Sequence, residues 1–145
     1  MATVTGSISI DRAPESVFDV LAAEELEPRY NPSMLSVEKL TEGPPGVGSR
    51  FRARHAPRRR PSEMVIEFTE FDRPRRLASS TTMPWGDVTG ALDLVATGTG
   101  TRLEWTWVVR PRGFAKVMSP VVGLIGARAE RACWEGLKRY LESGT

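Results

Sequence analysis

Four polar side chains are the candidates for chemistry in this sequence: His55, Tyr30, Ser79 and Thr81. His55 is the single histidine, and imidazole has an ordinary pKa that suits proton transfer near neutral pH. The hydroxyls of the other three could donate hydrogen bonds to an enolate or carbonyl oxygen. These residue types suit proton transfer on a ketone-containing substrate. The alternatives are a rim position for His55, which ends a predicted strand, and a structural cap for Tyr30.

Other common chemistries are not indicated. A single Cys and a single His leave no ligand set for a zinc site, so we expect no metal and no cofactor. The stretch TGTGT at 97–101 joins two predicted strands and is typical of a hairpin, not of a phosphate-binding loop. No pair of carboxylates falls in a predicted interior row, which argues against glycosidase-like hydrolysis. Cys133 lies on an apolar helical stripe without an activating cation, which indicates an inert core cysteine.

Length and charge limit the classes of partner. The 145 residues fit one domain, 1–145, and a net charge of +2 is too small to indicate nucleic acid binding. Arg58, Arg59 and Arg60 lie in a predicted loop, where they keep a hairpin tip solvated or attract an acidic partner. Without a long apolar stretch or a leader pattern, we expect a cytoplasmic protein that does not insert into membranes. A homodimer is compatible with the sequence.

The order of predicted elements is strand, two short helical segments, six strands and one long helix. Pro14 and Glu15 favour a helix start, and short turn signals between the later strands favour an antiparallel meander. Apolar residues at helical spacing predict the last helix, with Glu130 and Glu135 largely off its apolar stripe. The predicted strands are 3–10, 34–41, 49–55, 62–70, 76–82, 87–95 and 102–109, and the predicted helical segments are 14–23, 24–32 and 112–143.

This order predicts an α+β fold in which a curved seven-stranded antiparallel sheet wraps around the C-terminal helix. A gap between such a sheet and one helix is a natural ligand site, and the period of two along each strand predicts which side chains face it. The alternative for each inward-facing side chain is that it belongs to an ordinary packed core and does not line a cavity. The predicted lining consists of Phe51, Ala53, His55, Met64, Ile66, Phe68, Leu77, Ser79, Thr81, Val88, Leu92, Leu103, Trp105 and Trp107 from the sheet, and Met118, Val122, Ile125 and Ala129 from the helix.

Five segments in a fixed order span nearly the whole chain: SISIDRAPESVFDVLA, VEKLTEGPPGVGSRFRAR, FTEFDRPRRLASS, GTGTRLEWTW and CWEGLKRYLES. Together they resemble the START-like (Bet v 1-like, SRPBCC) helix-grip superfamily, in its bacterial polyketide cyclase/dehydrase-like branch. The resemblance implies a helix-grip fold and an apolar cavity for lipids, sterols, polyketides or similar molecules. Some members of this superfamily catalyse aromatic ring cyclisation or dehydration, but no catalytic motif transfers to residues of this chain.

Three functions remain open from the sequence. We favour binding of a small hydrophobic molecule, because the inward rows are aromatic and aliphatic with few polar groups. The alternative is a polyketide cyclase or dehydratase, which would use His55, Tyr30, Ser79 and Thr81. The second alternative is a protein-interaction module that uses the arginine-rich segment 50–60. The sequence does not decide whether the protein is catalytic.

Overall fold

Seven strands form one antiparallel sheet in the order β1-β7-β6-β5-β4-β3-β2. The computed structural model describes residues 2–56, 61–113 and 119–143, with residues 119–126 described by their backbone alone. The strands are β1 (Ala2–Ile10), β2 (Met34–Lys39), β3 (Arg50–His55), β4 (Ser62–Asp72), β5 (Arg76–Met83), β6 (Gly86–Thr97) and β7 (Gly100–Pro111). The helical segments are α1 (Pro14–Ala22), the 3-10 helix η1 (Glu24–Arg29) and α2 (Ser119–Glu142).

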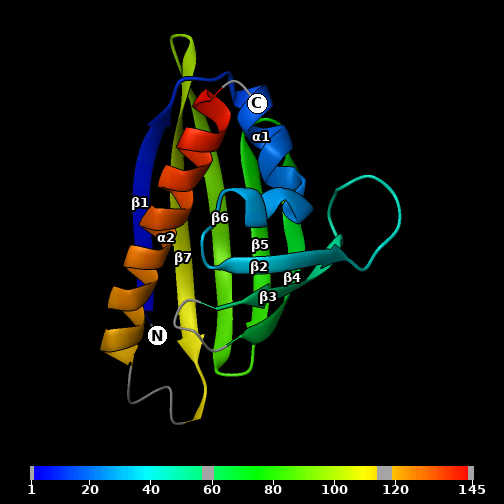
Figure 1. The fold of residues 1–145 in the computed structure, drawn as a ribbon, viewed down its shortest axis with the longest axis vertical. Helices are drawn as coiled ribbons and strands as arrows, with labels where there is room; N and C mark the ends of the chain where they lie inside the picture. Colours follow the sequence, from blue (N-terminus) through cyan, green and yellow to red (C-terminus); the bar gives the residue numbers. More distant parts are fainter. Residues whose placement is uncertain (1, 57–60, 114–118, 144–145) are drawn as a thin grey trace.

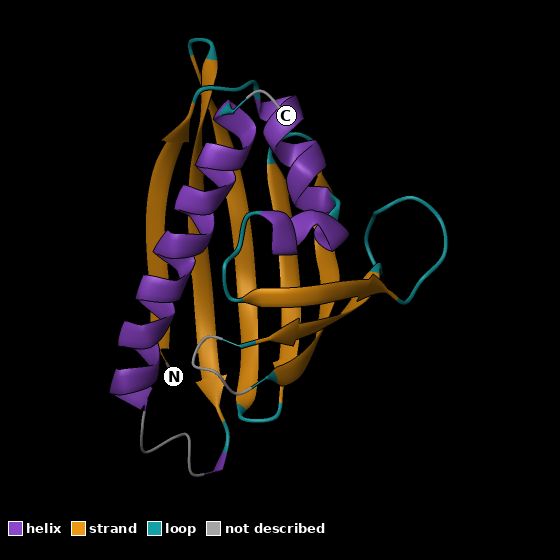
Figure 2. Ribbon diagram, in the orientation of Figure 1, coloured by secondary structure: helices purple, strands orange, loops and turns teal. Residues whose placement is uncertain are grey.

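The sheet is strongly curved, and its helices lie on one face (Figure 2). β2 and β3 run across the direction of β1, β7, β6 and β5, while α2 lies along the β1 and β7 side (Figure 1). α1 and η1 connect β1 at one edge of the sheet to β2 at the other edge. The predicted helix-grip architecture is therefore confirmed, including the two short helical segments between the first two strands.

The start of the last helix differs from the prediction. β7 continues through Pro111, which pairs with Gly86, and the backbone N–H of Arg112 donates to the carbonyl oxygen of Trp85 at 2.7 Å. The contact with Trp85, next to β6, therefore holds Arg112, the first residue of the predicted helix, beside the sheet. α2 begins at Ser119, after the undescribed residues 114–118.

The core fills the space under α1 and the C-terminal half of α2. Phe18, Phe51, Phe68, Leu103 and Leu137 are almost completely buried in one cluster. The ring of Phe51 lies 5.1 Å from that of Phe68, centroid to centroid. Apolar burial of this extent is the main force that holds sheet and helices together.

Two glycines allow close approaches that fix the position of α2. A Cβ at Gly136 would overlap with the carbonyl oxygen of Tyr30, so the residue that follows η1 can touch α2 only because residue 136 has no side chain. Gly6 on β1 leaves room in the same way for the indole ring of Trp105. That ring packs at 6.0 Å from Trp134 of α2, centroid to centroid. These contacts set where α2 crosses the sheet.

Candidate functional site

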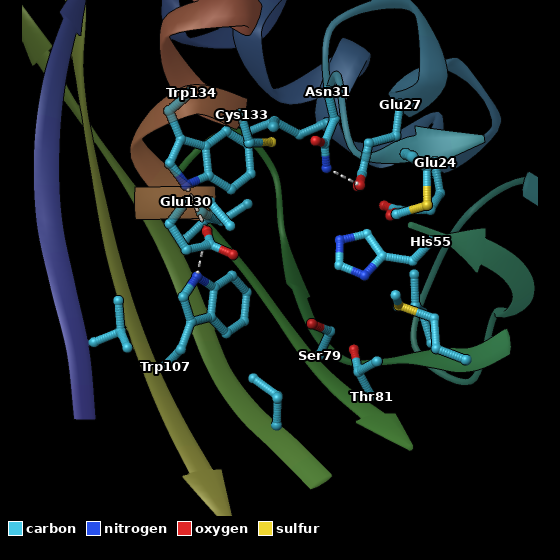
Figure 3. A pocket seen from close by; sticks show the side chains of 18 of the residues that line it. Glu24, Glu27, Asn31, His55, Ser79, Thr81, Trp107, Glu130, Cys133 and Trp134 are labelled. Atoms are coloured by element: carbon cyan, nitrogen blue, oxygen red, sulfur yellow. Dashed lines mark hydrogen bonds between the residues drawn. The ribbon is translucent and has the colours of Figure 1, made fainter. Parts of the chain in front are cut away.

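A cavity of about 400 Å³ lies between the sheet, η1 and α2 (Figure 3). Its apolar wall comes mainly from the strands, whose alternate side chains point to the concave face. Its carboxyl groups come from the helical segments. The lining residues are Val4, Leu21, Glu24, Glu27, Tyr30, Asn31, Met34, His55, Met64, Ile66, Phe68, Leu77, Ser79, Thr81, Met83, Trp85, Val88, Leu92, Trp107, Val109, Ala129, Glu130, Cys133 and Trp134.

The structure brings most of the predicted lining together. His55, Met64, Ile66, Phe68, Leu77, Ser79, Thr81, Val88, Leu92, Trp107 and Ala129 all line the cavity. Phe51, Ala53, Leu103 and Trp105 face the same side of the sheet but are buried in the packed core and do not line it. Met118 lies outside the described residues, as do the side chains of Val122 and Ile125.

Glu130 is the most unusual group in the site. It extends from α2 between two indole rings, and its Oε2 accepts a hydrogen bond from Trp107 Nε1 at 2.9 Å and from Trp134 Nε1 at 2.7 Å (Figure 3). Desolvation raises the pKa of Glu130 to about 7, against the opposing effect of the indole donors, and Glu27 contributes to the rise. The carboxyl can therefore take up or release a proton near neutral pH.

The helical pattern places Glu130 off the apolar stripe, and that interpretation is wrong. Its neighbours three and four positions away on the helix are Gly126, Ala127, Cys133 and Trp134, all small or apolar. Residues three and four positions apart share a face of a helix, so Glu130 lies on the same face as Cys133 and Trp134, which are buried. This local context is the signal in the sequence that could have identified it.

η1 contributes two more carboxyl groups to the cavity, those of Glu24 and Glu27. Glu24 is buried, and desolvation, together with the adjacent carboxyl of Glu27, raises its pKa well above the usual value. Glu27 Oε2 accepts a hydrogen bond of 2.8 Å from Asn31 Nδ2, and Asn31 Oδ1 accepts one of 3.0 Å from the N–H of Ser33. The expectation of an interior with few polar groups is corrected here, because three carboxyls enter from the helical segments instead of from the strand rows.

The four candidate residues for chemistry all line the cavity. His55 lies at the end of β3, half-buried, and desolvation lowers its pKa below the usual 6.5, so the imidazole is neutral at neutral pH. Ser79 and Thr81 share one face of β5 (Figure 3). Tyr30 is buried, and desolvation raises the pKa of its phenol well above the usual value, with Glu27 next in effect. The phenol is therefore a hydrogen-bond donor at neutral pH.

Cys133 also faces the cavity from α2. Desolvation, followed by the nearby Glu27 carboxyl, raises the pKa of its thiol well above the usual value. The thiol therefore stays protonated at neutral pH and is a poor nucleophile. Within the described ranges, no group of three or more His, Cys, Asp or Glu side chains is arranged to hold a metal ion.

Two observations concern possible partners of the protein. None of the described helices is both long and apolar enough to cross a bilayer. Arg58, Arg59 and Arg60, which the sequence singles out as a basic loop, lie outside the described residues.

The fold is similar to that of several solved proteins along nearly the full chain. A START superfamily protein from Mycobacterium smegmatis matches with a TM-score of 0.87 and 14% identity, covering 100% of both chains. The Zhui aromatase/cyclase from Streptomyces sp. R1128 matches with a TM-score of 0.85 and 16% identity, covering 97% of this chain and 93% of that chain. The protein TTHA0849 from Thermus thermophilus matches with a TM-score of 0.84 and 19% identity, covering 99% of both chains. At these identities the likeness establishes the fold.

The family follows from the sequence itself. No curated protein sequence matches the chain. A family model described as "Polyketide cyclase / dehydrase and lipid transport" matches residues 1–142, which confirms the resemblance that the short motifs carry. The chain therefore belongs to the polyketide cyclase/dehydrase and lipid transport family.

Proposed function

We propose that the protein binds a small, mainly apolar molecule in the cavity between the sheet and α2. The cavity itself carries this proposal, because about 400 Å³ lies within the usual range of sites for small molecules. Its strand walls are aliphatic and aromatic, and a few convergent polar groups can orient a guest. The family description also names lipid transport, which supports the proposal.

Filling the cavity from α2 tests this proposal. Ala129 lines the cavity, whereas Ala132 on the same helix is exposed. Ala129→Phe should occupy the hollow and weaken binding of apolar probes by at least about tenfold, while Ala132→Phe adds the same ring outside and should leave binding unchanged. Titration with a panel of aliphatic and aromatic compounds, read by tryptophan fluorescence and native mass spectrometry, measures this. If no compound binds the unmodified protein, or if both variants bind equally well, the proposal is wrong.

A second candidate is a cyclase or dehydratase that acts on a poly-ketone chain. The observation in its favour is a carboxyl with a pKa of about 7 in a cavity that also holds a neutral imidazole and several hydroxyl donors. Glu130 or His55 would remove a proton beside a carbonyl, and the hydroxyls of Ser79 and Thr81 would stabilise the enolate oxygen.

The enzymatic candidate has its own test. A poly-ketone thioester is incubated with the protein, and its cyclised products are followed by mass spectrometry. Glu130→Gln combined with His55→Gln should abolish turnover, whereas the exposed Ala132→Phe should not. Turnover that survives the double substitution would rule out this assignment of roles.

A further inference from the structure

The described part of the cavity wall has an uneven charge pattern. Glu24, Glu27 and Glu130 contribute carboxyls, whereas no Lys or Arg occurs among the described lining residues. His55 does not supply a positive charge at neutral pH, because burial lowers its pKa. A carboxylate-bearing guest such as a fatty acid anion would therefore meet like charge at low local dielectric.

Glu130 presents a free acceptor to this space. Its Oε2 holds both indole N–H donors, while its Oε1 has no hydrogen-bond partner among the described residues and points toward the cavity (Figure 3). Every buried side-chain oxygen of the described chain has a partner, so Oε1 retains contact with open space. The two tryptophans hold this carboxyl in place, and a guest that donates a hydrogen bond would complete its coordination.

One of these two rings also favours a cation. Trp107 and Trp134 both line the cavity beside Glu130, and their N–H groups are already used. Trp134 is buried and packs against Trp105, so what remains for a guest is the exposed part of the π surface of half-buried Trp107. That surface attracts positive charge, most strongly where water is excluded. A carboxylate between two aromatic rings is a suitable environment for an ammonium group.

We propose that the natural guest is an apolar molecule with a basic nitrogen, and that its protonated nitrogen pairs with Oε1 of Glu130 between Trp107 and Trp134. This inference rests on the proposed binding function and names the chemical class of the ligand. The apolar wall from β4, β5 and β6 accommodates the hydrocarbon part, and the carboxylate of Glu130 supplies the counter-charge.

Three probes with the same chain and different head groups test the inference: decylamine, decanol and decanoic acid. Dissociation constants are measured at pH 7.5, below the aggregation limit of each probe. We expect decylamine to bind at least about tenfold more tightly than decanol, and decanoic acid to bind most weakly. Glu130→Gln, which keeps an oxygen acceptor for both indoles, should reduce the preference for the amine to within about threefold while decanol still binds. Glu135→Gln, on an exposed position of α2, should keep the full preference.

Proton release provides a second readout. Pairing with an ammonium group favours the ionised carboxylate, so decylamine should displace the proton that Glu130 holds with a pKa of about 7. Calorimetry at pH 7 in buffers of different ionisation enthalpy should give release of about half a proton for decylamine and none for decanol. Glu24, Glu27, Tyr30, His55 and Cys133 also face this space, so the release is assigned to Glu130 by its loss in Glu130→Gln.

The outcomes separate the two proposals. If decanol or decanoic acid binds as tightly as decylamine, or if Glu130→Gln keeps the preference, the ligand class is wrong and the cavity remains a binding site. If none of the three probes binds, neither proposal holds.

Discussion

Replacing Glu130 by Gln should make the protein more stable above neutral pH. The native state holds a proton on this carboxyl up to a pKa of about 7, whereas the unfolded chain releases it near 4.5. Between these values the native state binds more protons, so the free energy of unfolding decreases as pH rises. The stabilising contribution is complete below about pH 4.5 and is lost as pH increases through 7. An amide at residue 130 keeps an acceptor for both indoles and removes this loss.

The magnitude follows from the pKa difference. A rise from 4.5 to about 7 corresponds to about 3–4 kcal/mol at complete burial, since one pKa unit is worth about 1.4 kcal/mol. The partial exposure of Glu130 to the cavity lowers this to about 1–2 kcal/mol. In a chain of this length, that difference corresponds to about 3–6 °C in melting temperature.

Urea unfolding at pH 5, 6, 7 and 8 measures the effect. The difference in free energy of unfolding between Glu130→Gln and the unmodified protein should be near zero at pH 5 and about 1–2 kcal/mol in favour of the variant at pH 8. Glu135→Gln is the matched control, because it makes the same change at an exposed position of α2, and it should follow the unmodified protein. Parallel curves for Glu130→Gln and the unmodified protein over this range would refute the reasoning, because Glu130 would then ionise equally in the folded and unfolded states.

Three further perturbations test the packing and the cavity. Gly136→Ala should destabilise by about 1–3 kcal/mol in thermal unfolding, because the new methyl overlaps with the carbonyl oxygen of Tyr30 although Ala is the better helix former; an unchanged or higher melting temperature would contradict this contact. Thr101→Val should cost about 1–2 kcal/mol in urea unfolding, because Thr101 is fully buried and its hydroxyl donates to the carbonyl oxygen of Arg12 at 2.7 Å; a cost near zero would argue against that bond. The ring protons of His55, the single histidine, should titrate with a midpoint below 6.5 in proton NMR, because burial disfavours the charged imidazole; a midpoint at or above 6.5 would place it in solvent.

The fold was largely predictable because strand alternation and turn residues are local signals. In β7, Leu103 and Trp105 alternate with Arg102 and Glu104, and this period of two alone identifies the buried face. The TGTGT hairpin between β6 and β7 is equally local. The start of α2 was predicted less well. The end of β7 is held by its pairing with the start of β6, and those residues lie too far apart in the sequence for a local helical pattern to indicate the contact.

The site was predictable only in part, because alternation identifies a face but not how tightly that face is covered. Trp105 and Trp107 point to the same side of β7, yet Trp105 is packed against Trp134 while Trp107 borders the cavity. The difference depends on where α2 crosses the sheet, and Gly6 and Gly136 determine this through tertiary contacts. Glu130 was missed for the same reason: an acidic residue is assigned to the surface unless the element that covers it is known.

The hollow beside α2 also affects how the protein responds to hydrostatic pressure. Unfolding eliminates internal void, so the unfolded chain with its hydration occupies less volume than the folded protein, and compression shifts the equilibrium toward it. The cavity of about 400 Å³ adds to this volume change wherever its apolar wall keeps water out. A guest that fills the void removes much of that change, so resistance to compression reports occupancy of the interior without any label or chromophore on the guest.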